Sequence, residues 1–194
     1  SGGGDEEPTE NPNASKPRYI WIDAAANFPD FANSKENIAR DLALAKDAGF
    51  TDIVVDVRPT TGDVLFKTNH VDQVKFMYAW IGSNYTKVER TATWDYLQAF
   101  VDEARKQGLR IHAAINTFVG GNQIDGGTGL LYRDQSKAAW ATQMNMQTGI
   151  TSVMNTSESA KFFNPAHPEV QTFLCNLLKD LASYDLDGIF LDRG

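Results

Sequence analysis

Four short apolar runs along the chain predict β-strands. The runs are rich in Ile, Val, Phe and small apolar residues, as expected for strands covered on both faces of a parallel sheet. They read YIWIDA, DIVVDV, RIHAAINTF and GIFLD, at Tyr19–Ala24, Asp52–Val57, Arg110–Phe118 and Gly188–Asp192.

Helical periodicity fills the intervals between these strands. Ser34 precedes the first predicted helix as an N-cap, and Gly49 ends it. Thr93 begins the second helix and Gly108 ends it, whereas Pro168 opens the third at its first position. Strands and helices in alternation predict a parallel sheet with right-handed crossovers.

The loops are tight before each strand and long after it. Residues 58–92 follow the second strand and residues 119–166 follow the third. Long loops at the carboxyl ends of strands are typical of active sites, in (β/α)8 barrels and in doubly wound sheets. A barrel is favoured because the turn after the first strand, DAAANFPDF, lacks the glycine pattern of a dinucleotide fold.

The length agrees with only part of such a barrel. A complete (β/α)8 TIM barrel needs eight strands and about 250 residues, and this chain of 194 residues ends two residues after its fourth predicted strand. The expected fold class is therefore α/β, with the chain holding the first four βα units of a longer protein. Expressed alone, it is expected to self-associate or stay molten.

The first residues have no apolar periodicity. The segment SGGGDEEPTENPNASK, residues 1–16, predicts a disordered tether, and residues 17–194 predict the barrel part. Its opening resembles the stretch after the lipidated cysteine of exported bacterial lipoproteins, and an ordinary flexible terminus is the alternative. The expected location is the periplasm or cell surface, with the membrane reached only through such a lipid anchor.

The net charge of the chain argues against nucleic acid as a partner. The net charge is −7, of which residues 1–15 carry −4, and no basic stripe is present for binding nucleic acid. Cys175, the one cysteine, is expected in the core beside leucines, because no histidine is near it in sequence.

Polar residues close all four predicted strands. A strand holds its last side chain rigidly at the mouth of a barrel, where an active site would lie. The alternative is that some of these residues only cap strands or helices. The strand-end residues are Asp23, Asp56, Arg58, Asn116, Asp192 and Arg193.

Other side chains extend this candidate site. His112 lies inside a strand and is either a site residue or a hydrogen-bonded core residue. Aromatic residues such as Trp21 and Trp80, flanked by Asn, Asp and Gln, are typical of sugar binding or of loop packing. No metal-ligand cluster is present, and no lysine lies in a predicted strand for an aldolase-type barrel. We expect no metal and no organic cofactor.

Four segments carry a resemblance to a known family. KPRYIWIDAA, AKDAGFTDIVVDVRPTTGDVLFKT, EARKQGLRIHAAINTFVGG and FNPAHPEVQTFLCNLLKDLASYDLDGIFLDRG resemble, in this order, glycosyl-hydrolase-like family 10. The motifs are those at Val57–Pro59, His112–Asn116, Asn164-Pro165 and Asp187–Asp192. The family's last motif often reads D-G-I-H-F-D-D, whereas this chain reads DGIFLDR. The resemblance implies an exported bacterial (β/α)8 barrel of the glycoside hydrolase type.

The expected function is hydrolysis of an extracellular poly- or oligosaccharide by carboxylates at the strand ends. Asp192 is the first catalytic candidate. Its partner carboxylate is expected on a later strand of the barrel, and Asp56 and Asp23 are the fallback partners within this chain. A non-catalytic glycan-binding lipoprotein with a degenerate barrel is the alternative. The residues expected to bind the carbohydrate are Arg58, His112, Asn116, Asn164, Trp21, Trp80 and Arg193.

Overall fold

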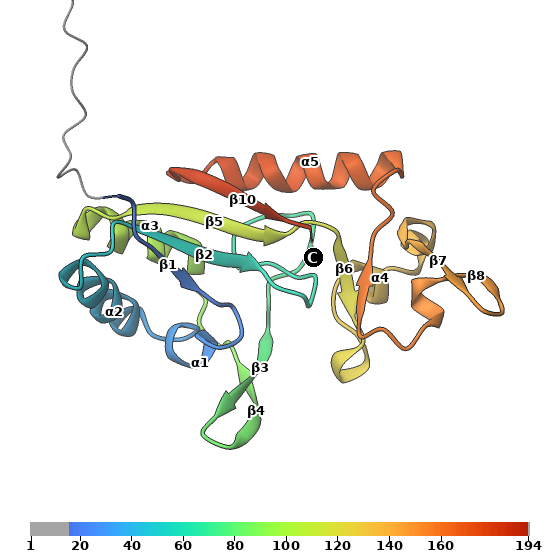
Figure 1. Ribbon diagram of the computed structural model, residues 1–194, viewed down its shortest axis with the longest axis horizontal. Coiled ribbons are helices and arrows are strands. Elements are labelled where there is room, and N and C mark those ends of the chain that lie inside the picture. Colours follow the sequence, from blue (N-terminus) through green and yellow to red (C-terminus); the bar gives the residue numbers. More distant parts are fainter. Residues whose placement is uncertain (1–15, 194) are drawn as a thin grey trace, which may run out of the picture.

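A four-stranded parallel sheet forms the centre of the computed structural model, which describes residues 16–193. The tether prediction lies, except for Lys16, outside the described residues. Neighbouring strands are all parallel, as predicted (Figure 1). The sheet order is β1 (Tyr19–Ile22), β2 (Asp52–Arg58), β5 (Arg110–Asn116) and β10 (Gly188–Asp192).

Three long helices alternate with these strands: α2 (Lys35–Asp47), α3 (Tyr96–Gln107) and α5 (Pro168–Ala182). The predicted cap of α2 is confirmed, since the Ser34 side chain accepts a hydrogen bond from the backbone N–H of Asn37. The predicted start of the second helix at Thr93 is wrong.

The side chain that caps α3 is Asp95, two residues later than predicted. It accepts from the backbone N–H of Gln98, so the helix begins at Tyr96. Gly108 ends α3 in the left-handed conformation, with φ +69°, as the prediction required.

The core lies between the sheet and the helices. Ile53, Val55 and Ile111 of the central strands are fully buried there, together with Ile38 and Leu42 of α2. The prediction that strands are buried on both faces holds for β2 and β5 but is wrong for β1 and β10. These two strands form the edges of the sheet.

The edge strands expose large side chains on the face opposite the helices. Trp21 of β1 is 58% exposed and Phe190 of β10 is 39% exposed, although their rings contact each other. Cys175 is also exposed, contrary to prediction. It lies beside the buried stripe of α5, which Phe173, Leu174 and Leu177 form.

The long loops at the carboxyl ends of the strands carry structure that periodicity did not predict. Antiparallel pairs form between β3 and β4, β6 and β9, and β7 and β8. The loop after β5 holds a 3-10 segment at Gln135–Trp140, followed by a strand at Gln143–Met146. No helix of residues 16–193 is long and apolar enough to cross a membrane.

The loop elements have these bounds. The strands are β3 (Phe76–Ile81), β4 (Asn84–Glu89), β6 (Val119–Asn122), β7 (Gln143–Met146), β8 (Gly149–Ser152) and β9 (Ala160–Phe162). The short helices are α1 (Phe28–Phe31) and α4 (Leu130–Arg133), with 3-10 segments η1 (Ile124–Gly126), η2 (Gln135–Trp140) and η3 (Val153–Asn155).

A buried ion-pair network ties the sheet together at its amino end. Asp52 is 1% exposed and accepts hydrogen bonds from Arg110 and Thr51, and its Oδ2 lies 2.7 Å from His112 Nε2. Burial by itself would raise the pKa of Asp52, but the hydrogen bonds from Arg110, Thr51 and His112 lower it to about 2. The ionised carboxylate therefore stabilises the folded chain.

We predict that Asp52→Asn destabilises the fold by about 2 kcal/mol at pH 7. The folded pKa of Asp52 is depressed, so its contribution is fully present above pH 3.8 and is lost as the pH falls through about 2. Urea unfolding of wild type and variant at several pH values measures the difference, which should shrink toward pH 2. Asp47→Asn, on the exposed end of α2, is the control. A pH-independent difference would contradict the ionic contribution.

Candidate active site

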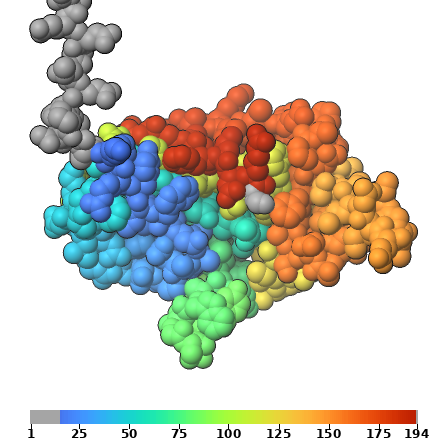
Figure 2. All heavy atoms as spheres, viewed as in Figure 1, coloured from blue at the N-terminus to red at the C-terminus, as the bar shows by residue number. Residues whose placement is uncertain are grey.

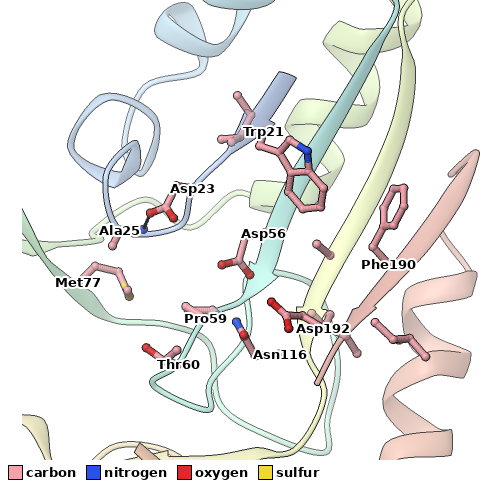
Figure 3. Close-up of a pocket in the computed structure, with 14 residues that line it drawn as sticks. Trp21, Asp23, Ala25, Asp56, Pro59, Thr60, Met77, Asn116, Phe190 and Asp192 are labelled. Carbon is pink, nitrogen blue, oxygen red and sulfur yellow. Dashed lines mark hydrogen bonds between the residues drawn. The ribbon is translucent and has the colours of Figure 1, made fainter. Parts of the chain in front are cut away.

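The carboxyl ends of the four central strands enclose a cavity of about 570 Å³. Figure 3 shows the carboxylates of Asp56 and Asp192 and the amide of Asn116 directed into this shared space. The residues that line the cavity are Trp21, Ile22, Asp23, Ala25, Asp56, Pro59, Thr60, Met77, Ala114, Ile115, Asn116, Phe190, Leu191 and Asp192.

Asp23 is oriented by the turn that follows β1. Its Oδ1 accepts hydrogen bonds from the backbone N–H groups of Ala25 and Ala26, both at 2.7 Å. Its own backbone N–H donates to Oδ1 of Asn27, also at 2.7 Å. This double anchoring places the carboxylate at the cavity rim, beside the end of β2.

Asp56 is the desolvated carboxyl of the cavity. Burial, together with the nearby charges of Asp23 and Asp192, raises its pKa to about 7, although the backbone hydrogen bond from Arg58 acts in the opposite direction. That hydrogen bond runs from Arg58 N–H to Asp56 Oδ1 at 3.1 Å. Asp56 is therefore protonated in a large fraction of molecules near neutral pH.

Asp192 and Asn116 are partners in the parallel register of β10 and β5. The Asn116 amide donates to the backbone carbonyl of Arg58 at 2.8 Å, and Thr117 N–H donates to the carbonyl of Asp192 at 2.8 Å. These contacts hold the ends of three neighbouring strands together. The exposed Asp192 carboxylate, the Asn116 amide and the Asp56 carboxylate lie around one shared space (Figure 3).

Arg58 does not line the cavity, so the expected sugar contact is wrong for this residue. The register between β2 and β5 shifts between Asp56 and Arg58, and this bulge pairs Arg58 with Ile115 rather than with Asn116. The extra residue breaks the twofold alternation of the strand, so the Arg58 side chain does not follow that of Asp56 into the cavity. The side chain is consequently fully buried.

The buried guanidinium of Arg58 binds only backbone oxygens. Nη1 donates to the carbonyls of Asn116 and Thr117, and Nη2 donates to those of Gly62 and Val119. Burial lowers its pKa to about 10, against the attraction of Asp63 and Asp56. Arg58 thus holds the ends of β2 and β5 together, and its positive charge acts to lower the pKa of Asp56.

Three more predicted residues lie away from the cavity. His112 is 8% exposed and bound to Asp52 at the amino end of the sheet, so its expected role in orienting hydroxyls is wrong. Asn164 is outside the cavity lining, and its Oδ1 accepts from Ala166 N–H before α5, so its contact with a carbohydrate stays a prediction. Trp80 is 68% exposed on the β3–β4 hairpin, outside the lining.

The remaining predicted residues stay candidates. The structure brings Asp23, Asp56, Asn116, Asp192 and Trp21 together around one cavity. Arg193 is exposed directly after β10 and is not among the lining residues. The contact of any of these residues with a carbohydrate remains a prediction.

Sequence reasoning missed the loop residues that complete the site. Met77 comes from β3 and lines the cavity, although no pattern in the sequence connects it to the strand ends. The Arg133 guanidinium forms a bidentate pair with Asp63, with both contacts at 3.0 Å, and also contacts Asp72 at 2.9 Å. These groups join two loops that are 70 residues apart in sequence, so no local signal could predict them.

No group of three or more His, Cys, Asp or Glu side chains that could hold a metal ion occurs within residues 16–193.

We predict that Asp56→Asn stabilises the fold by about 1–2 kcal/mol at pH 8. The pKa of Asp56 is about 7 in the folded protein, above its ordinary value of 3.8. The free energy of unfolding therefore falls as the pH rises from 3.8 to about 7, and it stays at the lower value at higher pH. Asn keeps the shape and the acceptor for Arg58 N–H without the charge. Urea unfolding should show the gain at pH 8 and no difference at pH 4, with Asp102→Asn as the surface control. A loss of stability at pH 8 would contradict the desolvated carboxylate.

Comparison with solved structures supports the barrel. The chain is similar to α-L-fucosidase isoenzyme 2 from Paenibacillus thiaminolyticus, with a TM-score of 0.57 and 17% identity, over 92% of this chain and 23% of that chain. A GH36 α-galactosidase from Geobacillus stearothermophilus gives a TM-score of 0.53 and 11% identity, over 91% and 21%. At such identities the likeness concerns the fold. It confirms part of a (β/α)8 barrel of the glycoside hydrolase type.

Sequence comparison gives the family. The chain is 31% identical over 180 residues to an S-layer-related protein from Niallia circulans, covering 90% of this chain and 11% of that protein. It thus spans only a small part of that relative. Residues 16–193 match the family described as glycosyl hydrolase-like 10. The predicted resemblance is confirmed, and the chain belongs to the glycosyl hydrolase-like 10 family.

Proposed function

We propose that the cavity is the active site of a glycoside hydrolase that acts on an extracellular poly- or oligosaccharide. The observation that carries the proposal is the contrast between two carboxyl groups of one cavity. Asp56 is desolvated, with a pKa of about 7, and Asp192 is exposed at the end of β10. Two carboxyl groups in different environments are what glycoside hydrolysis requires.

The different surroundings of Asp56 and Asp192 indicate the role of each carboxyl group in the proposed reaction. Asp56 is the general acid: its proton passes to the glycosidic oxygen as the bond between that oxygen and the anomeric carbon breaks. Asp192 supplies the second carboxylate, which either attacks the anomeric carbon or takes a proton from the attacking water. After either route, water supplies the hydroxyl of the new reducing end.

Other cavity residues support these roles. The Asp23 carboxylate raises the pKa of Asp56 and so favours its protonated form. The Asn116 amide faces the cavity, where it would orient a sugar hydroxyl. Trp21 and Phe190, whose ring centroids lie 5.6 Å apart, provide an apolar wall below the carboxylates.

The proposed location is the periplasm or the cell surface, with the chain anchored by lipid at its amino end. The printed name of the Niallia circulans relative, an S-layer-related protein, supports a surface location. The acidic opening segment, which lies outside the described residues, has the composition of a surface tether.

A non-catalytic glycan-binding protein is the second candidate. It is favoured by Arg193, which stands where the family's last motif often has a second Asp. Reducing-sugar release and binding, measured on one panel of bacterial and plant polysaccharides, distinguish the two functions. Binding without release would favour the second.

We predict that Asp192→Asn lowers turnover by about two to three orders of magnitude in a protein that carries the whole barrel. The amide keeps the shape of the side chain but can neither attack nor accept a proton. Steady-state kinetics and thermal melting should show lost turnover with the melting temperature retained. Asp102→Asn, on the outer face of α3, should keep both. Full activity of Asp192→Asn would show that another residue performs the chemistry.

We predict that kcat/KM falls as the pH rises through about 7, because the pKa of Asp56 governs the protonated acid. A pH–rate profile on the same substrate measures this basic limb. In Asp23→Asn the limb should move to lower pH, since one of the negative charges that raise the pKa of Asp56 is gone. An unchanged limb would contradict the assignment of Asp56 as the acid.

A further inference from the structure

The β3–β4 hairpin projects from the body of the molecule (Figures 1 and 2), and its residue Met77 lines the cavity. Its register pairs Tyr78 with Lys87 and Trp80 with Tyr85. The twofold alternation of a strand places Met77 and the other buried residues on the opposite side. One side of the hairpin therefore packs on the body, and the other carries aromatic rings.

Four rings form a continuous row on this side, which we call the aromatic face. The ring centroids of Phe76 and Tyr78 lie 6.1 Å apart, and those of Tyr78 and Tyr85 lie 5.3 Å apart in a stacked arrangement. Trp80 continues the row at 5.2 Å from Tyr85. The row runs across both strands to the tip of the hairpin.

A single carboxylate fixes the aromatic face in place. Asp125 in η1 accepts a hydrogen bond from the Tyr78 hydroxyl at 2.9 Å and pairs with Lys87 Nζ at 3.0 Å. Asp125 has φ +51° and is the only non-glycine residue with positive φ within residues 16–193. Such a backbone conformation is unfavourable, so the contacts to the hairpin hold a strained residue in position.

The outer part of the row is open to solvent. Trp80 is 68% exposed and Tyr85 is 58% exposed, although each is large enough to bury extensive apolar area. Lys87 is paired with Asp125, and the remaining charge on this side is Glu89, opposite Phe76 at the end of the row away from the tip. An uncharged ligand with flat apolar faces and hydroxyl edges fits this surface.

We propose that the aromatic face is an accessory site that binds an uncharged glycan chain outside the catalytic cavity. The C–H faces of pyranose rings stack on Trp80 and Tyr85, and the polar groups of Tyr78, Lys87 and Asp125 border the stack. The identity of the ligand class rests on the proposed function. The site adds a second point of attachment for a polymeric substrate.

The position of the hairpin favours a glycan over other occupants. Strand β3 supplies Met77 to the wall of the cavity, so the accessory site and the candidate active site share one strand (Figure 3). A polymer held on the aromatic face is therefore attached to the hairpin whose opposite side contributes Met77 to the cavity. The ion pair and hydroxyl along the row suit a hydroxylated ligand better than a lipid interior.

Native electrophoresis in gels that contain hydroxyethyl cellulose, galactomannan, xylan or glycogen tests the proposal on the protein with the whole barrel. At least one polysaccharide should retard the wild type. The variant Trp80→Ala/Tyr85→Ala should bind that polysaccharide at least about tenfold more weakly. Ile81→Ala is the matched control, because Ile81 is 49% exposed at the same tip but on the opposite side by alternation. It should bind like the wild type.

Three results would overturn the proposal. One is a wild type that none of the four polysaccharides retards. Another is equal binding by the double variant. The third is retention on phosphatidylcholine vesicles instead of polysaccharides, lost in the double variant, which would identify a membrane-binding tip.

Asp192→Asn separates this proposal from the proposed function. If Asp192→Asn hydrolyses normally while Trp80→Ala/Tyr85→Ala loses polysaccharide binding, the catalytic assignment fails and the accessory site stands. If Asp192→Asn is inactive and binding is equal in all variants, the accessory site fails alone.

Discussion

The site depends on one buried cation, Arg58, and on the backbone oxygens that solvate it. Its guanidinium donates to four carbonyls, three of them in the segment that follows or ends β5. A fully buried charge is costly without such partners, and its loss would leave several carbonyls unpaired. Arg58 therefore makes the ends of β2 and β5 one rigid unit.

The main chain of Arg58 completes this arrangement. Its N–H donates to Asp56, and its carbonyl accepts the amide of Asn116. The residue thus orients two cavity side chains without entering the cavity itself. The bulge before Arg58 produces both effects, because it turns the cation away from the cavity and leaves Asp56 facing it.

The desolvation of Asp56 links stability to function. Near neutral pH the cavity holds this carboxyl close to two other acidic groups, an arrangement that raises its pKa and weakens the fold. The amino end of the sheet shows the opposite design, because Asp52 is surrounded by donors that lower its pKa. Within one sheet, ionisation of the carboxyl group at the amino end stabilises the fold, and ionisation of the one at the carboxyl end destabilises it.

Local signals in the sequence predict much of this fold. Apolar runs give the four central strands, and capping residues such as Ser34 and Gly108 give the helix ends. The strand ends predict Asp23, Asp56, Asn116 and Asp192 at one cavity, since parallel strands end at the same edge. These features depend on neighbours in sequence or on the rule of parallel pairing.

The sequence-based predictions fail at positions whose surroundings depend on contacts between residues far apart in the sequence. A bulge is not encoded in the alternation of DIVVDVR, so Arg58 was expected in the cavity. For His112 the sequence leaves open a site residue or a hydrogen-bonded core residue. The second is correct, but its partner Asp52 lies 60 residues away, so no local signal distinguishes the two. The clamp between Asp125 and the β3–β4 hairpin also joins distant segments, and Tyr78 lies 47 residues from it.

The ionisation of Asp56 is the most direct test of the account. A titration followed by ¹³C NMR of the aspartate carboxyl carbons, with Asp56→Asn used to assign its signal, measures the pKa in the folded protein. The account predicts a pKa of about 7 for Asp56, and a lower value in Asp192→Asn because a neighbouring negative charge is removed. An Asp56 carboxyl that titrates near 3.8 in the wild type would contradict it.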